Sequence, residues 1–197
     1  ARRDGDHYVI NGSKTFITNG QHANLIIVVA KTDREAGAKG TSLLLVETEA
    51  VQGFRRGRKL DKVGLKAQDT SELFFDDVRV PVSNLVGEEH RGFECLTRNL
   101  AHERLVQAVR SAAVAEVTIE QTVEYTAQRE AFGQRIADFQ NTQFKLAELK
   151  AATVAGRVFV DRCIEMQLAG ALDPVDAATA KLVLSDLPNR VGAECLQ

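Results

Sequence analysis

The sequence has 197 residues, of which 44% are hydrophobic and 26% are charged, a composition typical of globular proteins with one large domain or two small ones. Its 25 Lys and Arg residues nearly balance its 27 Asp and Glu residues, so no strong overall charge attracts nucleic acid or an anionic membrane. No apolar run approaches the roughly 18 residues of a membrane-spanning helix. We therefore expect no nucleic-acid partner and no membrane span.

Two further features bound the interpretation. Cys95, Cys163 and Cys195 have no metal-type spacing, which favours buried or idle thiols in a reducing compartment and no metal site. The chain begins at Ala1 without a methionine and ends at Gln197 in a segment with a structured pattern. We expect it to be a piece of a longer protein, with any leader upstream of Ala1.

Up to about residue 84 the apolar pattern is short and punctuated, which predicts β-strands. The dipeptide Asn11-Gly12 lies between apolar runs at 8–10 and 13–18 and predicts a tight hairpin turn. Residues 25–30 and 42–47 are rich in Ile, Val and Leu and predict two more strands. Residues 72–75 and 78–81 predict a further strand pair.

The stretch KTFITNG at residues 14–20 places an aromatic side chain and a hydroxyl two positions apart. In a regular strand Phe16 and Thr18 share a face. A flat apolar wall beside a hydroxyl suits a planar heteroaromatic ring with polar edges. On these grounds alone the ordinary alternative is stronger, because a phenylalanine in a sheet is usually a core residue.

From residue 87 onward the apolar period becomes that of a helix. The residues that carry it predict a short first helix (Phe93, Leu96, Leu100), a long helix over about 102–128 (Leu105, Val109, Ala112, Ile119, Val123) and another long helix (Phe144, Ala147, Ala151, Val154, Val158). These helices are expected to pack antiparallel.

Helix ends are also marked in the sequence. We expect Asn141 or Thr142 to cap the third helix and Gly170 to close it. Asp173-Pro174 predicts the start of the next helix, with a capping carboxylate followed by proline at the first helical position. Pro188 is expected to kink that helix or to start a new one. The fold class is therefore α+β, with a β domain at 1–86, a linker near 83–89 and a helical domain at 87–197.

Six motifs occur in an order that resembles one family over nearly the full length. They are residues 10–14 (INGSK), 16–20 (FITNG), 60–66 (LDKVGLK), 76–81 (DDVRVP), 103–105 (ERL) and 129–134 (REAFGQ). The chain resembles the middle β domain and part of the C-terminal helical domain of the acyl-CoA dehydrogenases. Residues 103–105 resemble the long-chain and isovaleryl types most. The resemblance implies an antiparallel, β-barrel-like middle domain followed by a truncated antiparallel helical bundle.

The resemblance implies an FAD cofactor that contacts Phe16, Ile17 and Thr18. In the family the position of Phe16 is often tryptophan and lies against the flavin ring, and the threonine at the position of Thr18 hydrogen-bonds the reactive edge of that ring. Phe16 departs from tryptophan and lacks its indole N–H, but a phenyl ring still supplies an apolar wall.

A second group of residues resembles positions that reach the dinucleotide part of FAD in a neighbouring subunit. These are Arg129, Phe132 and Gln140. A guanidinium suits a pyrophosphate because its planar fork donates two charge-assisted hydrogen bonds, whereas without the motif Arg129 is an ordinary surface residue at a helix end. The resemblance implies that one flavin site uses two chains of a homotetramer.

Glu103 is the candidate catalytic base. In most of the family the base comes from a later segment, but in the long-chain and isovaleryl types it comes from the position of Glu103. Burial beneath a flavin and an acyl chain would raise the pKa of a carboxylate toward the working range. The structural alternative is that the helix dipole favours any glutamate in a first turn. Arg104 is the candidate substrate-binding residue, and His102 is expected to lie on the surface.

The function implied is FAD-dependent oxidation of an acyl-CoA to the trans-2-enoyl-CoA, with electrons passed to an electron-transferring flavoprotein, in the bacterial cytoplasm or the mitochondrial matrix. Two alternatives are an acyl-CoA oxidase or related flavin monooxygenase, and a non-catalytic family member that acts as an assembly or binding partner. The basic run at residues 55–59 favours either a phosphate of CoA or an ordinary charged loop. Acyl length and branching stay open.

Overall fold

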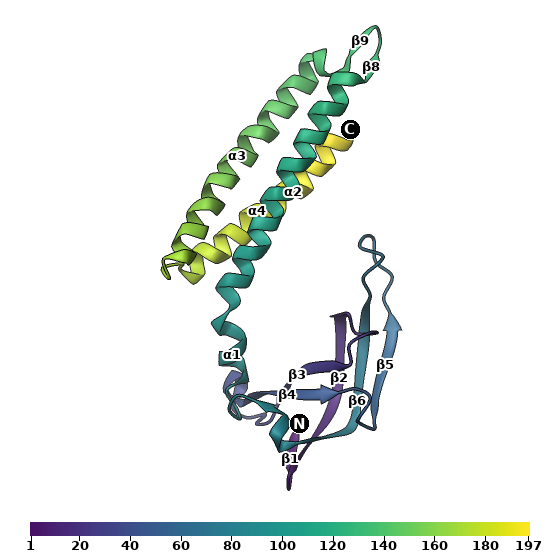
Figure 1. The fold of residues 1–197 in the computed structure, drawn as a ribbon, viewed down its shortest axis with the longest axis vertical. Helices are drawn as coiled ribbons and strands as arrows, with labels where there is room; N and C mark the ends of the chain where they lie inside the picture. Colours follow the sequence, from purple (N-terminus) through teal and green to yellow (C-terminus); the bar gives the residue numbers. More distant parts are fainter. The chain divides into compact units, whose positions relative to one another are not determined.

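The computed structural model describes all residues from 1 to 197 and divides into two compact units. We call Ala1–Thr97 the strand unit and Arg98–Gln197 the helix unit. Their secondary structure differs as the change in apolar period predicts (Figure 1). Contacts within the chain assign residues 87–97 to the strand unit, and the domain boundary expected at 86/87 stays a prediction.

The strand unit contains two antiparallel sheets, with strand orders β1-β2-β6-β5 and β3-β4-β7. The strands are β1 (Arg2–Asp4), β2 (His7–Thr18), β3 (Leu25–Lys31), β4 (Thr41–Glu47), β5 (Phe54–Lys59), β6 (Thr70–Pro81) and β7 (Leu85–Val86). Short 3-10 turns lie at Gly37–Gly40 and Val82–Asn84, and helix α1 spans Gly92–Arg98. The strands expected at 25–30 and 42–47 are confirmed.

The two sheets pack against each other through one apolar core. Its buried members are Tyr8, Ile10, Val28, Leu44, Val46, Leu73, Phe75, Val78 and Val80. Alternate residues of β2, β4 and β6 supply this layer, as expected when one face of each sheet is buried. The sheets remain separate and do not close into a continuous barrel. Because both sheets enclose one core, the unit is barrel-like in its packing, as expected.

The hairpin expected at Asn11-Gly12 is wrong, because β2 runs straight through both residues. The Asn11 side-chain amide donates a hydrogen bond to Asp77 Oδ1 at 2.8 Å, and the Asp77 backbone N–H donates to Asn11 Oδ1 at 2.9 Å. This exchange fills a bulge in the β2–β6 ladder. The tight turn lies instead at residues 5–6, between β1 and β2. The strand pair expected at 72–81 is likewise one continuous strand, β6.

The helix unit contains three long helices, α2 (Leu100–Gln128), α3 (Gln140–Leu168) and α4 (Pro174–Leu196). A small hairpin, β8 (Glu130–Ala131) and β9 (Gln134–Arg135), and a 3-10 turn at Ile136–Asp138 connect α2 to α3. Figure 1 shows that α3 runs antiparallel to α2, as expected. The core joins Leu105, Ala108, Ala112, Ala115 and Ile119 of α2 to Leu149, Val160, Cys163, Ala180, Leu184, Leu187 and Val191. Alanines on α2 allow the helices to approach closely.

The apolar stripe expected to bury α3 is exposed in this chain. The side chains of Phe144, Val154 and Val158 are 64%, 49% and 65% exposed. The face that is buried instead consists of Leu149, Thr153, Gly156, Val160 and Cys163. Helix α3 has two apolar faces, and α2 and α4 cover only one of them, so the prediction of the helix is confirmed but that of its buried face is wrong.

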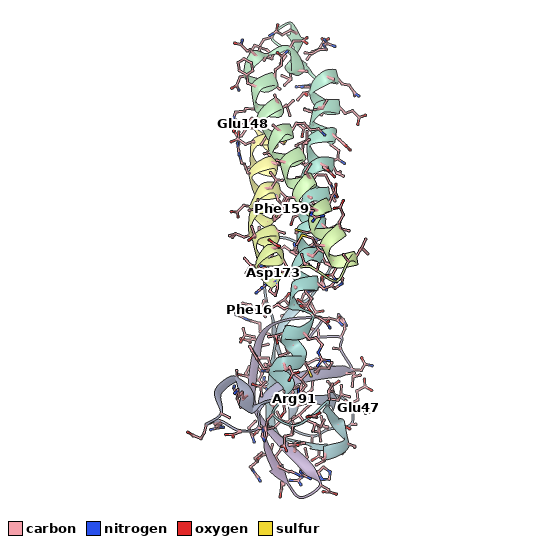
Figure 2. The ribbon with its side chains drawn as sticks, turned by 90° about the vertical axis from the view of Figure 1, so that its left-hand side faces the viewer. Phe16, Glu47, Arg91, Glu148, Phe159 and Asp173 are labelled. Atoms are coloured by element: carbon pink, nitrogen blue, oxygen red, sulfur yellow. The ribbon has the colours of Figure 1, made fainter.

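The helix ends follow their local signals in part. The Asp173 carboxylate accepts a hydrogen bond from the Val175 N–H at 2.6 Å and caps α4, as expected (Figure 2). Gly170 follows α3 with a φ of +66°, the conformation that favours glycine after a helix. Neither Asn141 nor Thr142 caps α3, which begins at Gln140 without a side-chain cap. Helix α4 continues through Pro188 to Leu196, so no new helix begins there.

Candidate cofactor and substrate site

Phe16 lies at a bulge near the end of β2 and points out of the fold (Figure 2). The ladder pairs Lys14 with Leu73 and Ile17 with Ser71, so one extra residue is present on β2 between these pairs. The backbone of Phe16 has a φ of +60°, and its side chain is 75% exposed. A bulky residue in the left-handed region is strained. The bulge interrupts the regular alternation from which Phe16 and Thr18 were expected to share a face of the strand. The Phe16 ring nevertheless lies outside the apolar core.

The two residues after Phe16 return to regular pairing with β6. Ile17 pairs with Ser71 and is half-buried against the apolar core, whereas Thr18 pairs with Thr70 and is exposed. Their opposite exposure is the usual alternation of a strand with one buried face. An exposed phenyl ring and an exposed hydroxyl therefore lie two residues apart at one edge of the strand unit.

Glu103 and Arg104 lie in the first turn of α2. The backbone N–H of Glu103 donates to the Asn99 carbonyl at 3.0 Å, while the Glu103 side chain is exposed and has no hydrogen-bond or ion-pair partner in the chain. Arg104 is half-buried, and His102 is exposed as expected. The positive end of the helix dipole favours a carboxylate in this first turn, whether or not the carboxylate has a catalytic role.

Arg129 and Phe132 lie in the connection from α2 to α3, and Gln140 is the first residue of α3. Phe132 and Gly133 form the two-residue turn of the β8–β9 hairpin, with φ values of +55° and +81°. Two positive φ values define a turn that normally selects Asn, Asp or Gly at its first position. Phe132 is instead 97% exposed in that strained conformation.

The side chains beside Phe132 are also available to a ligand. Arg129 is exposed directly after α2, where its carbonyl accepts a hydrogen bond from the Ile136 N–H at 2.8 Å. Gln140 is exposed at the first position of α3. The three expected residues therefore lie in or directly beside one connection, and all three side chains are exposed or partly exposed at the surface of the helix unit.

Helix α2 separates the two predicted parts of the helix unit. At about 1.5 Å of rise per residue, Glu103 and Arg129 lie about 39 Å apart along its axis. Both residues belong to the same continuous helix and its immediate end, so this distance is fixed. One compact site of a single chain cannot use both.

The basic run at residues 55–59 lies in strand β5 and not in a loop. The Arg55 guanidinium stacks over the Phe74 ring at 4.2 Å, and the Arg56 guanidinium lies 5.3 Å from the centre of the Phe54 ring. Such contacts stabilise arginine on an aromatic face. No group of three or more His, Cys, Asp or Glu side chains is placed to hold a metal ion, and no helix combines the length and apolarity required to cross a membrane.

Comparison with protein families decides the identity of this fold. The model for the acyl-CoA dehydrogenase middle domain matches residues 1–78, and the model for the C-terminal domain matches residues 90–197. The chain belongs to the acyl-CoA dehydrogenase family. The motif order described above is thereby confirmed, as is the fold of strand sheets followed by helices.

Individual relatives agree with this family. The chain is 48% identical to the mitochondrial long-chain specific acyl-CoA dehydrogenase of Sus scrofa, covering 100% of itself and 46% of that protein. It is 49% identical to a solved acyl-CoA dehydrogenase of Geobacillus kaustophilus, with a TM-score of 0.94, covering 100% of itself and 52% of that chain.

A third solved relative has a different description. Its structure is described as the electron transferring flavoprotein of Acidaminococcus fermentans. The matched chain is 36% identical to this one, with a TM-score of 0.91, and the match covers 100% of this chain and 51% of that chain. This member of the acyl-CoA dehydrogenase family spans about half the length of the relatives that it matches.

Proposed function

We propose that the complete protein is an FAD-dependent acyl-CoA dehydrogenase that oxidises an acyl-CoA thioester to the trans-2-enoyl-CoA. The observation that carries this proposal is the exposed, strained Phe16 beside the exposed hydroxyl of Thr18. Strained backbone of this kind clusters at active sites, ligand clamps and switch regions. The two residues occupy the positions that resemble the flavin contact of the family.

The side chains in both units fit the chemistry of FAD. Phe16 offers a flat apolar surface and Thr18 a hydrogen-bond donor for the flavin ring, with Ile17 between them. Arg129 offers a guanidinium for the pyrophosphate, and Phe132 and Gln140 add an aromatic surface and an amide. When bound, FAD supplies the hydride acceptor of the reaction.

Glu103 is proposed to remove the proton next to the thioester carbonyl, and Arg104 to orient the substrate. The Glu103 carboxylate is exposed in this chain, so its basicity would rise only when substrate and the rest of the protein exclude water from it. A carboxylate from the part of the protein beyond this chain is the alternative base. The family contains both arrangements.

The proposed assembly is a homotetramer in which each flavin site uses two chains. The fixed span of α2 supports a shared site, because Arg129 cannot reach the ligand of its own Glu103. An electron-transferring flavoprotein is the proposed electron acceptor, in line with the description of one similar solved chain. A long-chain acyl-CoA is the favoured substrate class, given the similarity to a long-chain specific enzyme. The proposed compartment is the bacterial cytoplasm or the mitochondrial matrix.

The test uses the complete purified protein and its Glu103→Gln variant. The wild type is expected to hold FAD whose absorption bleaches when acyl-CoA is added without oxygen. The variant should keep its FAD but bleach about 10² to 10⁴ times more slowly. Glu120→Gln, which changes another exposed carboxylate of α2, is the matched control and should behave as wild type.

Each other result contradicts a different part of the proposal. Normal bleaching of Glu103→Gln places the base outside this chain. Rapid formation of peroxide during turnover identifies an oxidase or monooxygenase. A correctly assembled wild-type protein without FAD identifies a non-catalytic assembly or binding partner. A series of acyl-CoA substrates of increasing length then defines the specificity.

A further inference from the structure

The turn at residues 19–23, directly after Thr18, is anchored on one side by Asp69. The backbone N–H of Gln21 donates to Asp69 Oδ2 at 2.9 Å, and the backbone N–H of Asn19 donates to the Asp69 carbonyl at 3.2 Å. Asp69 directly precedes β6 and is only 4% exposed. Two backbone N–H groups of the turn therefore donate hydrogen bonds to one buried residue that lies far away in the sequence.

The opposite side of the same turn is anchored by Arg56 of β5. Its Nε donates to the Gly20 carbonyl at 3.3 Å, and its Nη2 donates to the Ala23 carbonyl at 2.9 Å and to Thr48 Oγ1 at 3.1 Å. The Asp69 carboxylate thus accepts a hydrogen bond from one backbone N–H of the turn, while the Arg56 guanidinium donates to two of its backbone carbonyls. Hydrogen bonds in which one partner is ionised are the stronger kind.

The turn also lies so close to the sheet that a side chain at Gly20 would not fit without a rearrangement. A Cβ atom on Gly20 would lie 2.5 Å from Ser71 Oγ and 3.1 Å from the Ile17 carbonyl. The Gln21 side chain adds a bond to the sheet, since its Nε2 donates to the Gly57 carbonyl at 3.1 Å. The turn is consequently held by β5, by β6 and by direct contact.

The backbone conformation next to this turn indicates what Arg56 and Asp69 do besides stabilising the fold. Phe16 has a φ of +60°, which is strained for a bulky residue, and Asn19 has a φ of +63°, which asparagine tolerates. Residues with positive φ therefore flank Ile17 and Thr18 on both sides. Strained conformations persist only where the surrounding structure over-determines them. Arg56 and Asp69 supply charged anchors immediately beyond the strained stretch.

We propose that Arg56 and Asp69 are positioning residues that hold the turn at residues 19–23, and through it Phe16 and Thr18, in the geometry that binds the flavin. The inference rests on the proposed function and deepens it. It gives Arg56 a role different from contact with CoA, although Arg56 belongs to the basic run. It also gives a buried carboxylate outside the proposed catalytic residues a part in tuning the cofactor.

The experiment compares the complete wild-type protein with the variants Arg56→Met, Arg56→Lys and Asp69→Asn. Arg58→Met on β5 and Asp76→Asn on β6 are matched controls, because both side chains are exposed. FAD affinity, the midpoint potential of the bound flavin and thermal unfolding are measured for each. Arg56→Met and Asp69→Asn should bind FAD about tenfold more weakly and shift the potential. Arg56→Lys should recover part of the loss, and the controls should match wild type.

Two outcomes overturn separate claims. Variants that unfold at a lower temperature but bind FAD with wild-type affinity and potential show a purely structural role, which overturns the inference alone. A wild-type protein that binds no FAD overturns the proposed function. If Arg56→Met does not fold, Arg56→Lys decides, because a folded Arg56→Lys protein with wild-type affinity and potential also overturns the inference.

Discussion

The guanidinium of Arg157 on α3 and the carboxylate of Glu116 on α2 form two parallel hydrogen bonds. Arg157 Nε donates to Glu116 Oε1 at 2.8 Å, and Nη2 donates to Oε2 at 2.5 Å. Both side chains are partly buried, at 29% and 28% exposure. This planar, bidentate geometry is the best arrangement for an arginine and a carboxylate. The pair therefore links α3 directly to α2, in addition to their shared apolar core.

The first prediction is a measurable coupling between these two residues. A double-mutant cycle with Arg157→Met and Glu116→Gln should give a coupling energy of about 1 to 2 kcal/mol, because the geometry is bidentate and partly shielded from water. The exposed pair Arg162 and Glu165, which lies within α3, is the matched control and should give about 0.5 kcal/mol or less. Equal couplings in denaturant unfolding would contradict the special role of the first pair.

The second prediction concerns pH. The hydrogen bonds from Arg157 lower the pKa of the Glu116 carboxyl below its usual 4.5. Because the folded pKa is the lower one, this stabilisation is fully present above pH 4.5 and is lost as the pH falls through the folded value. The stability difference between wild type and Glu116→Gln should therefore shrink below pH 4.5. Unfolding curves from pH 7 to pH 3 measure it, and a constant difference would refute the expected linkage.

The third prediction contrasts two glycines in helices. A Cβ on Gly156 of α3 would lie 2.8 Å from Leu184 Cδ1 and 3.3 Å from Leu187 Cδ2, so Gly156→Ala should lower the free energy of unfolding, because overpacking that costs about 1 to 3 kcal/mol outweighs a gain of about 1 kcal/mol in helix propensity. Gly192 of α4 has no atom within 4 Å of such a Cβ. Gly192→Ala should raise stability by about 0.5 to 1 kcal/mol through helix propensity. Chemical denaturation tests both signs, and a destabilised Gly192→Ala would count against this packing.

The fourth prediction is a trade of stability against cofactor binding at Phe132. Phe132→Asn places a residue that tolerates positive φ in the β8–β9 turn and should stabilise the protein by about 1 kcal/mol. The same change removes the exposed ring and should weaken FAD binding. Phe132→Leu retains a bulky residue at positive φ, so it should bring no gain in stability. Thermal unfolding and FAD titration measure the two effects, and a destabilised Phe132→Asn would refute the strain argument.

Local patterns in the sequence predicted the elements that depend on near neighbours. The strands β3 and β4 follow from short apolar runs, and α2 follows from a single apolar stripe. The cap by Asp173 also follows, because its partner is only two residues away. In each case the interactions that decide the structure lie within the segment itself.

The remaining features depend on partners far away in the sequence. The turn expected at Asn11-Gly12 gave way to a bulge because Asp77 lies across the sheet. The buried face of α3 is decided by α2 and α4, since the helix has a second apolar face of its own. The anchoring of the turn at residues 19–23 was not predicted for the same reason, because Arg56 and Asp69 contact this turn only in the assembled sheet.

The length of α2 has a consequence for how this protein tolerates insertions and deletions. One added residue would turn everything beyond it by about 100° and move it by about 1.5 Å along the axis. The Arg129 end would then face a different direction from the Glu103 end, and the two chains of the proposed shared flavin site could no longer meet the same cofactor. We expect natural length variants to occur in surface connections such as residues 169–173, while α2 keeps its number of residues unchanged.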